Sequence, residues 1–234
     1  MSKKNTYYII PMKVFELFAG SRSVGKIAEE LGMEVFSCDW IDYGGIDYVS
    51  DIMKFDYSKV PFKPDIIWAS PPCTGFTVSA IGRNWRLGKN DKPIATTQSS
   101  KMGIKMVKKT IEIINYFDPE FFFIENPRGM MRKMNFMEQF NRHTVTYCQY
   151  GDNRMKPTDI WTNSESWTPK EPCKNGAPCH VAAPRGSRTG TQGLANAHER
   201  SKIPNELCNE ILESCLLTKM FSNEKTSNTF IGII

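Results

Sequence analysis

Apolar runs and helical spacings alternate along the first two-thirds of this sequence. Six short apolar runs are typical of strands, at residues 13–20, 34–40, 64–70, 119–127, 143–151 and 158–163. Apolar residues recur every three or four positions in 23–33 and in 101–116, as they do on one face of a helix. This alternation predicts an α/β fold with a doubly wound, mostly parallel sheet. Functional side chains are then expected at the carboxyl ends of the strands.

The pattern changes after Asn163. Residues 162–200 are rich in Pro, Gly, Ser and charge and carry almost no apolar periodicity, which predicts a small irregular insert. An amphipathic helix follows, within 201–220, and a polar tail is expected over 221–234.

Composition narrows the class of protein. Hydrophobic residues make up 40% and charged residues 24%, as in an ordinary soluble domain. The net charge of +5 suits a polyanionic partner but does not by itself indicate one. No apolar run is long enough to span a membrane, and the start of the chain lacks the cleavage site of a signal peptide. Seven scattered cysteines favour reduced thiols, so we expect a cytoplasmic protein.

Three strand ends carry groups suited to a nucleoside ligand. Gly20 permits a tight turn before the first helix, whose amides could face an anionic group such as a carboxylate. Asp39, ending the second strand, could accept both hydroxyls of a ribose, and Trp40 could stack on a purine. Asp51 could accept the exocyclic amine of that purine. The alternatives are a solvated Asp39 and a core Trp40.

The strings ELFAGSRSVG, CDW, SDI, SPPC, IENP and QYGDNRMKPTDIW occur in the order of the motifs of cytosine-5 DNA methyltransferases. The chain resembles a small, orphan, phage-like member of that family over residues 14–161 and, more weakly, 200–212. The resemblance implies a Rossmann-like, S-adenosylmethionine-dependent fold with a catalytic domain over 10–161, completed by the helix in 201–220. The residues it assigns to the cofactor are Phe18, Ala19, Gly20, Ser21, Arg22, Ser23, Asp39, Trp40, Asp51, Ile52, Ser70 and Ser201.

The resemblance makes Cys73 the nucleophile. Carbon 5 of cytosine needs activation, which a thiolate supplies by adding to carbon 6, and the rigid Pro71–Pro72 pair fits a nucleophile held in a set geometry. A buried structural cysteine is the alternative. Glu125, ending an apolar run, is assigned to ring nitrogen 3 and the exocyclic amine of a flipped cytosine. A plain ion-pair partner is its alternative.

The third catalytic motif departs from the family pattern. A gapless overlay places Arg154, Lys156 and Thr158 where the family has glutamine, arginine and arginine. Lys156 can still supply positive charge near the nucleophile, whereas Thr158 stands in place of the arginine with which the family grips the base. The residues expected to contact substrate are Pro72, Asn126, Arg154, Thr158, Arg83, Arg185 and Arg188.

The insert is expected to recognise the target. Its Lys and Arg residues fit phosphate contacts, which carry little sequence information, so short or loose target specificity is expected. Cys173, Cys179 and His180, with Cys148 and His198 nearby in sequence, are a candidate zinc set. Because their spacing matches no standard zinc module, no metal is expected.

The resemblance and these observations together predict a DNA (cytosine-5)-methyltransferase that acts on duplex DNA. We expect it to be a monomer without a membrane partner, in the cytoplasm of a bacterial or phage-infected bacterial cell. Residues 74–100, basic and glycine-containing, are expected to close over the substrate. Three alternatives stay open: methyl transfer to an exocyclic amine, a catalytically inactive nucleic-acid-binding fold, and RNA as substrate. An amine-directed enzyme needs an aromatic ring at position 73 and has no use for a thiol there.

Overall fold

The computed structural model describes residues 11–182, 194 and 196–229, and the fold is built on one sheet of seven strands. In chain order its strands are β1 (Lys13–Leu17), β2 (Glu34–Asp39), β3 (Tyr48–Val49), β4 (Ile66–Ala69), β7 (Phe121–Pro127), β8 (Asn141–Thr146) and β9 (Pro157–Thr162). A separate hairpin is formed by β5 (Trp85–Leu87) and β6 (Pro93–Ala95). The helices are α1 (Ser23–Glu30), α2 (Ile81–Asn84), α3 (Gln98–Phe117), α4 (Ala197–Ser201) and α5 (Asn205–Thr229).

The strand order is β3-β2-β1-β4-β7-β9-β8. The first five strands in this order, from β3 through β2, β1 and β4 to β7, pair in parallel. Strand β9 lies antiparallel between β7 and β8. The chain winds outward from β1 to β3 and then returns to the other side of β1 at β4. The strand order therefore reverses between β1 and β4, and open α/β sheets bind their ligands at the carboxyl ends of the strands at such a point. The predicted fold class is confirmed.

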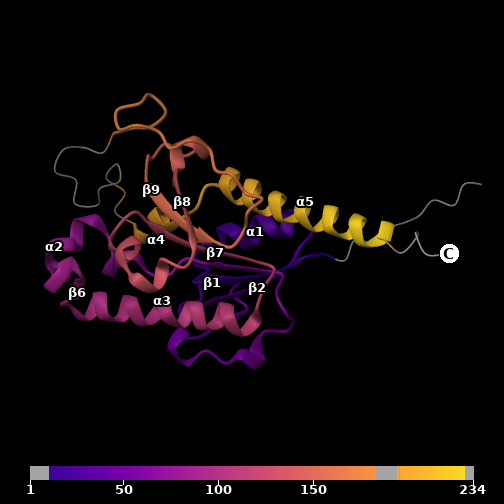
Figure 1. The fold of residues 1–234 in the computed structure, drawn as a ribbon, viewed down its shortest axis with the longest axis horizontal. Helices are drawn as coiled ribbons and strands as arrows, with labels where there is room; N and C mark the ends of the chain where they lie inside the picture. Colours follow the sequence, from indigo (N-terminus) through magenta and orange to yellow (C-terminus); the bar gives the residue numbers. More distant parts are fainter. Residues whose placement is uncertain (1–10, 183–193, 195, 230–234) are drawn as a thin grey trace, which may run out of the picture.

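Helices cover both faces of the sheet. Figure 1 shows α1 and α5 on one side of the sheet and α3 on the other. Side chains alternate along the strands, so Val14 packs with α1 and α5 while Phe15 packs with α3. Among the described residues, no helix has the length and apolar composition needed to cross a bilayer.

Two elements differ most from their predicted bounds. The run 143–151 was expected to be one strand, but β8 ends at Thr146 and the 3-10 helix η8 (Tyr147–Tyr150) follows. The last helix continues to Thr229, where a tail from 221 was expected. Residues 205–229 contain neither Pro nor Gly, so a helix held by its packed first half can propagate through the polar end.

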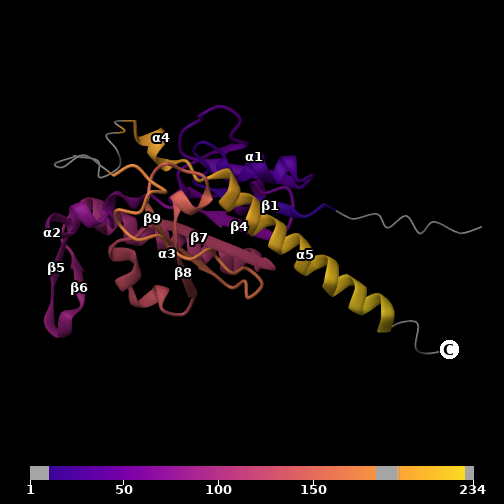
Figure 2. The same ribbon diagram turned by 90° about the horizontal axis from the view of Figure 1, so that it is seen from above.

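The segment after Cys73 has structure of its own. It contains α2 and the β5–β6 hairpin, which extends away from the sheet in Figure 2. Thr97 then begins α3 with reciprocal bonds: its side chain accepts from the Ser100 amide, and the Ser100 side chain accepts from the Thr97 amide. This hairpin belongs to the region expected to close over substrate, and its closure stays a prediction.

Candidate active site

The register of the sheet brings the predicted site residues to one edge. Leu17 pairs with Cys38 on one side and with Ala69 on the other, so Asp39 and Ser70 follow at the same level. Ala69 in turn pairs with Ile124, so Ser70 and Glu125 lie side by side at the ends of the adjacent strands β4 and β7. The antiparallel β9 adds residues from its amino end, because Thr158 pairs with Pro127 and Lys156 immediately precedes the strand.

Cys73 begins the 3-10 helix η3 (Cys73–Gly75) and is half-buried. Asn126 Nδ2 donates to the Pro71 carbonyl oxygen at 2.7 Å, which ties the cysteine loop to the strand of Glu125. Behind the cysteine, Gly75 lies so close to α3 that a Cβ there would stand 2.9 Å from the Ser99 carbonyl oxygen. Cys73 is therefore held on a braced turn rather than on a free loop.

Glu125 is almost fully buried, with 5% of its surface exposed. Tyr147 Oη donates to Glu125 Oε1 at 3.1 Å, and the Ser70 hydroxyl also hydrogen-bonds to this carboxyl. Trp68 Nε1 donates to Ser70 Oγ at 2.9 Å. Burial raises the pKa of Glu125, while the charge of Lys156 and these hydrogen bonds oppose that rise. The carboxyl is fixed from two sides and is suited to holding a proton.

Lys156 completes the group. Its Nζ donates to the Arg200 carbonyl oxygen at 2.9 Å and lies 4.4 Å from the centre of the Tyr147 ring. Burial lowers the pKa of Lys156, and the charge of Glu125 opposes this.

The three groups influence one another's ionisation. Burial raises the pKa of the Cys73 thiol, the charge of Glu125 raises it further, and Lys156 lowers it. Neutralising Glu125 therefore favours the thiolate at Cys73. The sequence indicated all three of these residues but not Tyr147, which was predicted to lie in a strand. In the structure, Tyr147 contacts both Glu125 and Lys156.

The other residues expected at the substrate behave differently. Arg154 is 6% exposed; its Nε donates to Asp152 Oδ1 at 2.9 Å, and its Nη1 donates to the Glu199 and Arg200 carbonyl oxygens at 3.3 Å. These partners give Arg154 a structural role, joining the loop before β9 to α4, in place of the expected substrate contact. Thr158 is buried and donates to the Lys156 carbonyl oxygen at 3.1 Å.

Of the three arginines expected to contact substrate outside the strand ends, one lies on the surface and two fall outside the described residues. Arg83 is exposed on α2, whereas Arg185 and Arg188 lie outside the described residues.

The turn after β1 has the predicted conformation but a different set of partners. Gly20 adopts φ +51°, and its amide donates to Asp39 Oδ2 at 3.0 Å. The amides of Val24 and Gly25, at the start of α1, donate to Glu16 at 3.1 and 3.0 Å. These two amides are thus unavailable to a ligand, which corrects the expectation that the helix amides face one. Burial raises the pKa of Glu16 to about 7. Glu16 was not among the predicted site residues, although an acidic residue inside an apolar strand is itself a signal.

A cavity of about 330 Å³ opens beside this turn. Among its lining residues are Gly20, Ser21, Ser23, Tyr43, His198 and Lys202. Ser201 itself donates to the His198 carbonyl oxygen.

The residues expected to hold the nucleoside differ in their availability. Asp39 accepts from the Gly20 and Ile41 amides through separate oxygens, and since a carboxylate has about four acceptor sites, some remain free. Trp40 is 73% exposed, so the alternative of a core tryptophan is wrong. Asp51 Oδ1 accepts from the Met53 amide, and Ile52 is buried in the core.

The candidate zinc residues do come together. Cys148 from η8 joins Cys173, Cys179 and His180 in one cluster, which the sequence-based expectation of no metal did not foresee. His198 is not part of it and instead lies against Tyr43, with ring centres 4.9 Å apart.

Comparison with known proteins agrees with this geometry. The profile of the C-5 cytosine-specific DNA methylase family matches residues 43–147. A Frog virus 3 (isolate Goorha) protein named probable DNA (cytosine-5)-methyltransferase is 31% identical over 220 residues, covering 87% of this chain and all of that protein.

Similar solved structures include the Entamoeba histolytica methyltransferase EhMeth, 12% identical with a TM-score of 0.47, and Schizosaccharomyces pombe Dnmt2, 12% identical with a TM-score of 0.44. They cover 69% and 68% of this chain, which spans 57% and 52% of theirs. On the full-length match to the viral relative and on the family profile, the chain belongs to the C-5 cytosine-specific DNA methylase family, whose methyl donor is S-adenosylmethionine.

Proposed function

We propose that this protein transfers a methyl group from S-adenosylmethionine to carbon 5 of cytosine in DNA through a covalent adduct at Cys73. The observation that carries the proposal is the position of Cys73, Glu125 and Lys156 at one edge of the sheet, where Asn126 ties the loop of Cys73 to the strand of Glu125. A cysteine that served only packing would have no need of a buried acid and a buried base as its neighbours.

Each residue has a defined task in this reaction. The Cys73 sulfur forms a bond to carbon 6 of cytosine while Glu125 holds a proton against ring nitrogen 3. The electrons of the double bond between carbons 5 and 6 are then available at carbon 5. Carbon 5 then takes the methyl that S-adenosylmethionine supplies. Loss of the carbon-5 proton to a base expels the sulfur and restores the ring. Lys156 stabilises the thiolate before attack, and its own position depends on the Arg200 carbonyl.

The thiol and the carboxyl work in sequence. Glu125 in its ionised form disfavours the Cys73 thiolate, so a protonated Glu125, hydrogen-bonded to the base, removes that obstacle. Arrival of cytosine would therefore activate the nucleophile.

The turn after β1 and the loop after β2 fit S-adenosylmethionine. The cavity beside Gly20 has room for the amino-acid end, and Lys202, which pairs with Glu199 at 2.9 Å, lies in its lining near the expected carboxylate. Asp39 retains acceptor sites for ribose hydroxyls, and the uncovered indole of Trp40 offers a face to adenine.

Duplex DNA is the proposed substrate, and its target base must leave the stack to reach Cys73. Because only residues 162–200 are available for reading the target, we expect short or loose specificity. Lys170 of this segment is already held by Glu206 and by the Tyr150 ring, so it is a weaker candidate for a phosphate contact than exposed Lys174.

Trapping with 5-fluorocytosine tests the mechanism. Fluorine at carbon 5 cannot leave as a proton does, so the sulfur–carbon bond persists and a denaturation-resistant protein–DNA adduct forms. We expect this adduct in the presence of S-adenosylmethionine with the wild type and with Cys215→Ala, a core-cysteine control, and its loss in Cys73→Ser.

The same assay separates the alternatives. An adduct with fluorinated RNA but not DNA would make RNA the substrate. Methylated product without an adduct, carrying the methyl on the exocyclic nitrogen by mass spectrometry, would replace the carbon-5 reaction. Cofactor binding with neither product nor adduct would indicate an inactive binding protein.

A further inference from the structure

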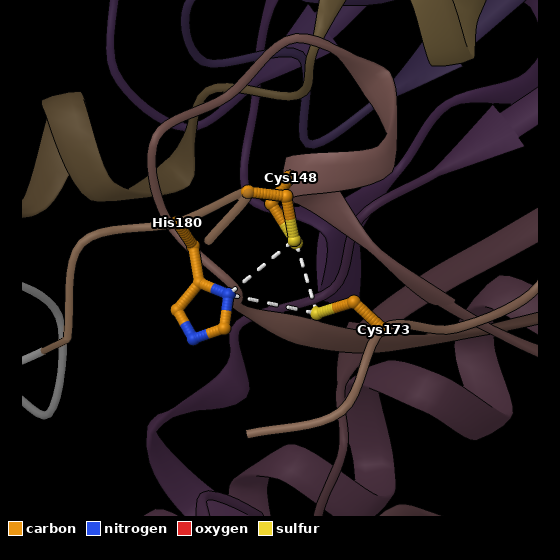
Figure 3. A group of neighbouring side chains, drawn as sticks. Cys148, Cys173 and His180 are labelled. Carbon is orange, nitrogen blue, oxygen red and sulfur yellow. Dashed lines mark hydrogen bonds between the residues drawn. The ribbon is translucent and has the colours of Figure 1, made fainter. Parts of the chain in front are cut away.

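Three thiols and one imidazole converge next to the active site. The side chain of Cys148 comes from η8, while Cys173, Cys179 and His180 come from the irregular segment 163–182. One ligand atom from each residue lies within 4.8 Å of every other. Figure 3 shows Cys148, Cys173 and His180 pointing toward a common centre. Cys148 is thus brought together with three residues that lie 25 or more positions further along the chain.

The spacing of these atoms is that of a tetrahedral zinc site. Bonds of about 2.3 Å to sulfur and 2.0 Å to nitrogen place two sulfurs about 3.8 Å apart, and sulfur and nitrogen about 3.5 Å apart. His180 Nδ1 lies 3.7 Å from Cys173 Sγ and 3.6 Å from Cys179 Sγ. Cys179 Sγ lies 3.6 Å from Cys148 Sγ.

One edge of the tetrahedron is short. Cys148 Sγ and Cys173 Sγ are 3.1 Å apart, which is still well beyond the roughly 2.05 Å of a disulfide. All the cysteines of the chain are free thiols in the structure. The cluster is therefore closer to a metal-ligand set than to a cystine.

The donor types select the metal. Three soft thiolates and one imidazole suit Zn²⁺ rather than Mg²⁺ or Ca²⁺, which prefer oxygen ligands. Four protein ligands leave no open position, as is typical of structural rather than catalytic zinc. Gln149 Nε2 lies 3.5 Å from Cys179 Sγ, where it can donate to a coordinated thiolate.

The two halves of the segment 163–182, which has neither helix nor strand, are attached differently. Its first half is held by Trp167, which is buried in the core and donates to Glu210 at 2.9 Å, and by the Lys170 amide, which donates to Tyr150 Oη. Its second half, which carries three of the ligands, is attached by backbone bonds. The Cys173 amide donates to Thr146 Oγ1, and the Val181 amide donates to the Asn153 carbonyl oxygen, both at 2.9 Å. Each of these anchors lies beside a proposed ligand.

The cluster also touches the catalytic framework. Cys148 directly follows Tyr147, the residue that donates to Glu125 and lies under Lys156. We propose that Cys148, Cys173, Cys179 and His180 bind one structural Zn²⁺ that fastens the target-recognition segment to η8 and fixes Tyr147 against Glu125. Three thiols give up their protons to the solvent as the metal binds.

Metal analysis of the full-length protein tests the site without reference to activity. Protein purified without chelators from zinc-supplemented medium is expected to hold about one zinc per chain. Cys179→Ser is the main variant because this side chain is exposed and its replacement spares the core. We expect it to lose most of the zinc, while Cys215→Ala retains it.

Two further measurements guard against misfolding of a variant. Cobalt added to the metal-free wild type should give the intense visible bands of a tetrahedral thiolate site, weakened in Cys179→Ser. A chelator should lower the melting temperature of the wild type and leave that of Cys179→Ser unchanged.

Three results would overturn the proposal: folded wild type with no bound metal and no cobalt spectrum, a Cys148–Cys173 disulfide in alkylated protein, or iron instead of zinc.

Discussion

Replacing Tyr147 with phenylalanine tests how the catalytic carboxyl is tuned. The change removes the hydroxyl that donates to Glu125 at 3.1 Å and keeps the ring beneath Lys156. That hydrogen bond favours the ionised carboxylate, so its loss raises the pKa of Glu125 above its already elevated value.

The size of the change follows from the strength of the bond. A hydrogen bond to a charged group contributes about 1.5–3 kcal/mol. Because one pKa unit corresponds to about 1.4 kcal/mol, the upper limit is a rise of roughly one to two units. Ser70 remains bonded to the carboxyl and compensates in part, so we expect a rise of about one unit.

The assay is the single-turnover rate of methyl transfer to DNA as a function of pH. If protonated Glu125 is the active form, the rate falls as pH rises through its pKa, and in Tyr147→Phe this fall should move upward by about one unit. Tyr150→Phe is the matched control, because its hydroxyl donates to Glu210 instead, at 3.2 Å, from the same 3-10 helix. An unmoved profile in Tyr147→Phe, or an equal shift in both variants, would refute this account.

Three further changes test the framework of the site. In Gly129→Ala the new Cβ would stand 2.2 Å from the Phe76 carbonyl oxygen, so overpacking should lower the free energy of unfolding by about 1–3 kcal/mol, whereas Gly82→Ala, with open space around it, should not. Thr97→Ala removes the cap of α3 and should lower the free energy of unfolding by about 1 kcal/mol. Glu16 has a pKa near 7 when folded and 4.5 otherwise, so the folded state binds the extra proton and stability falls as pH rises through that window. Between pH 4.5 and about 7, the free energy of unfolding of the wild type should fall by about 3 kcal/mol relative to that of Glu16→Gln, as measured by denaturant melts. An equal pH dependence in the two proteins would contradict the burial effect.

The sheet could be predicted because its strands are continuous apolar runs. Parallel strands buried on both faces, such as β4 and β7, leave that record in the sequence. The reversal of β9 could not be read in the same way, since direction within a sheet depends on partners far along the chain. The end of β8 at Thr146 was also hidden, because the apolar residues Tyr147 and Tyr150 continue the run while the backbone turns into a 3-10 helix.

The position of the candidate site was predictable for residues that end or follow an apolar run. Cys73 and Glu125 each end an apolar run, and the register then places them at one edge. Arg154 was misassigned because a motif overlay carries no information on which partners an arginine meets. The fourth member of the thiol cluster, Cys148, lies 25 residues before Cys173, and only the path of the insert back onto η8 brings the two together.

The insertion of β9 between β7 and β8 sets the order in which the protein can be completed during synthesis. Until residues 157–162 leave the ribosome, the edge of β7 has no neighbour and β8 has no strand to join. The apolar face that receives α5 stays uncovered for some forty residues more. A nascent chain that already carries Cys73 and Glu125 therefore exposes both an unpaired strand edge and a hydrophobic face, the two features that make folding intermediates associate. By packing on that face, α5 both completes the core and removes the exposed hydrophobic surface.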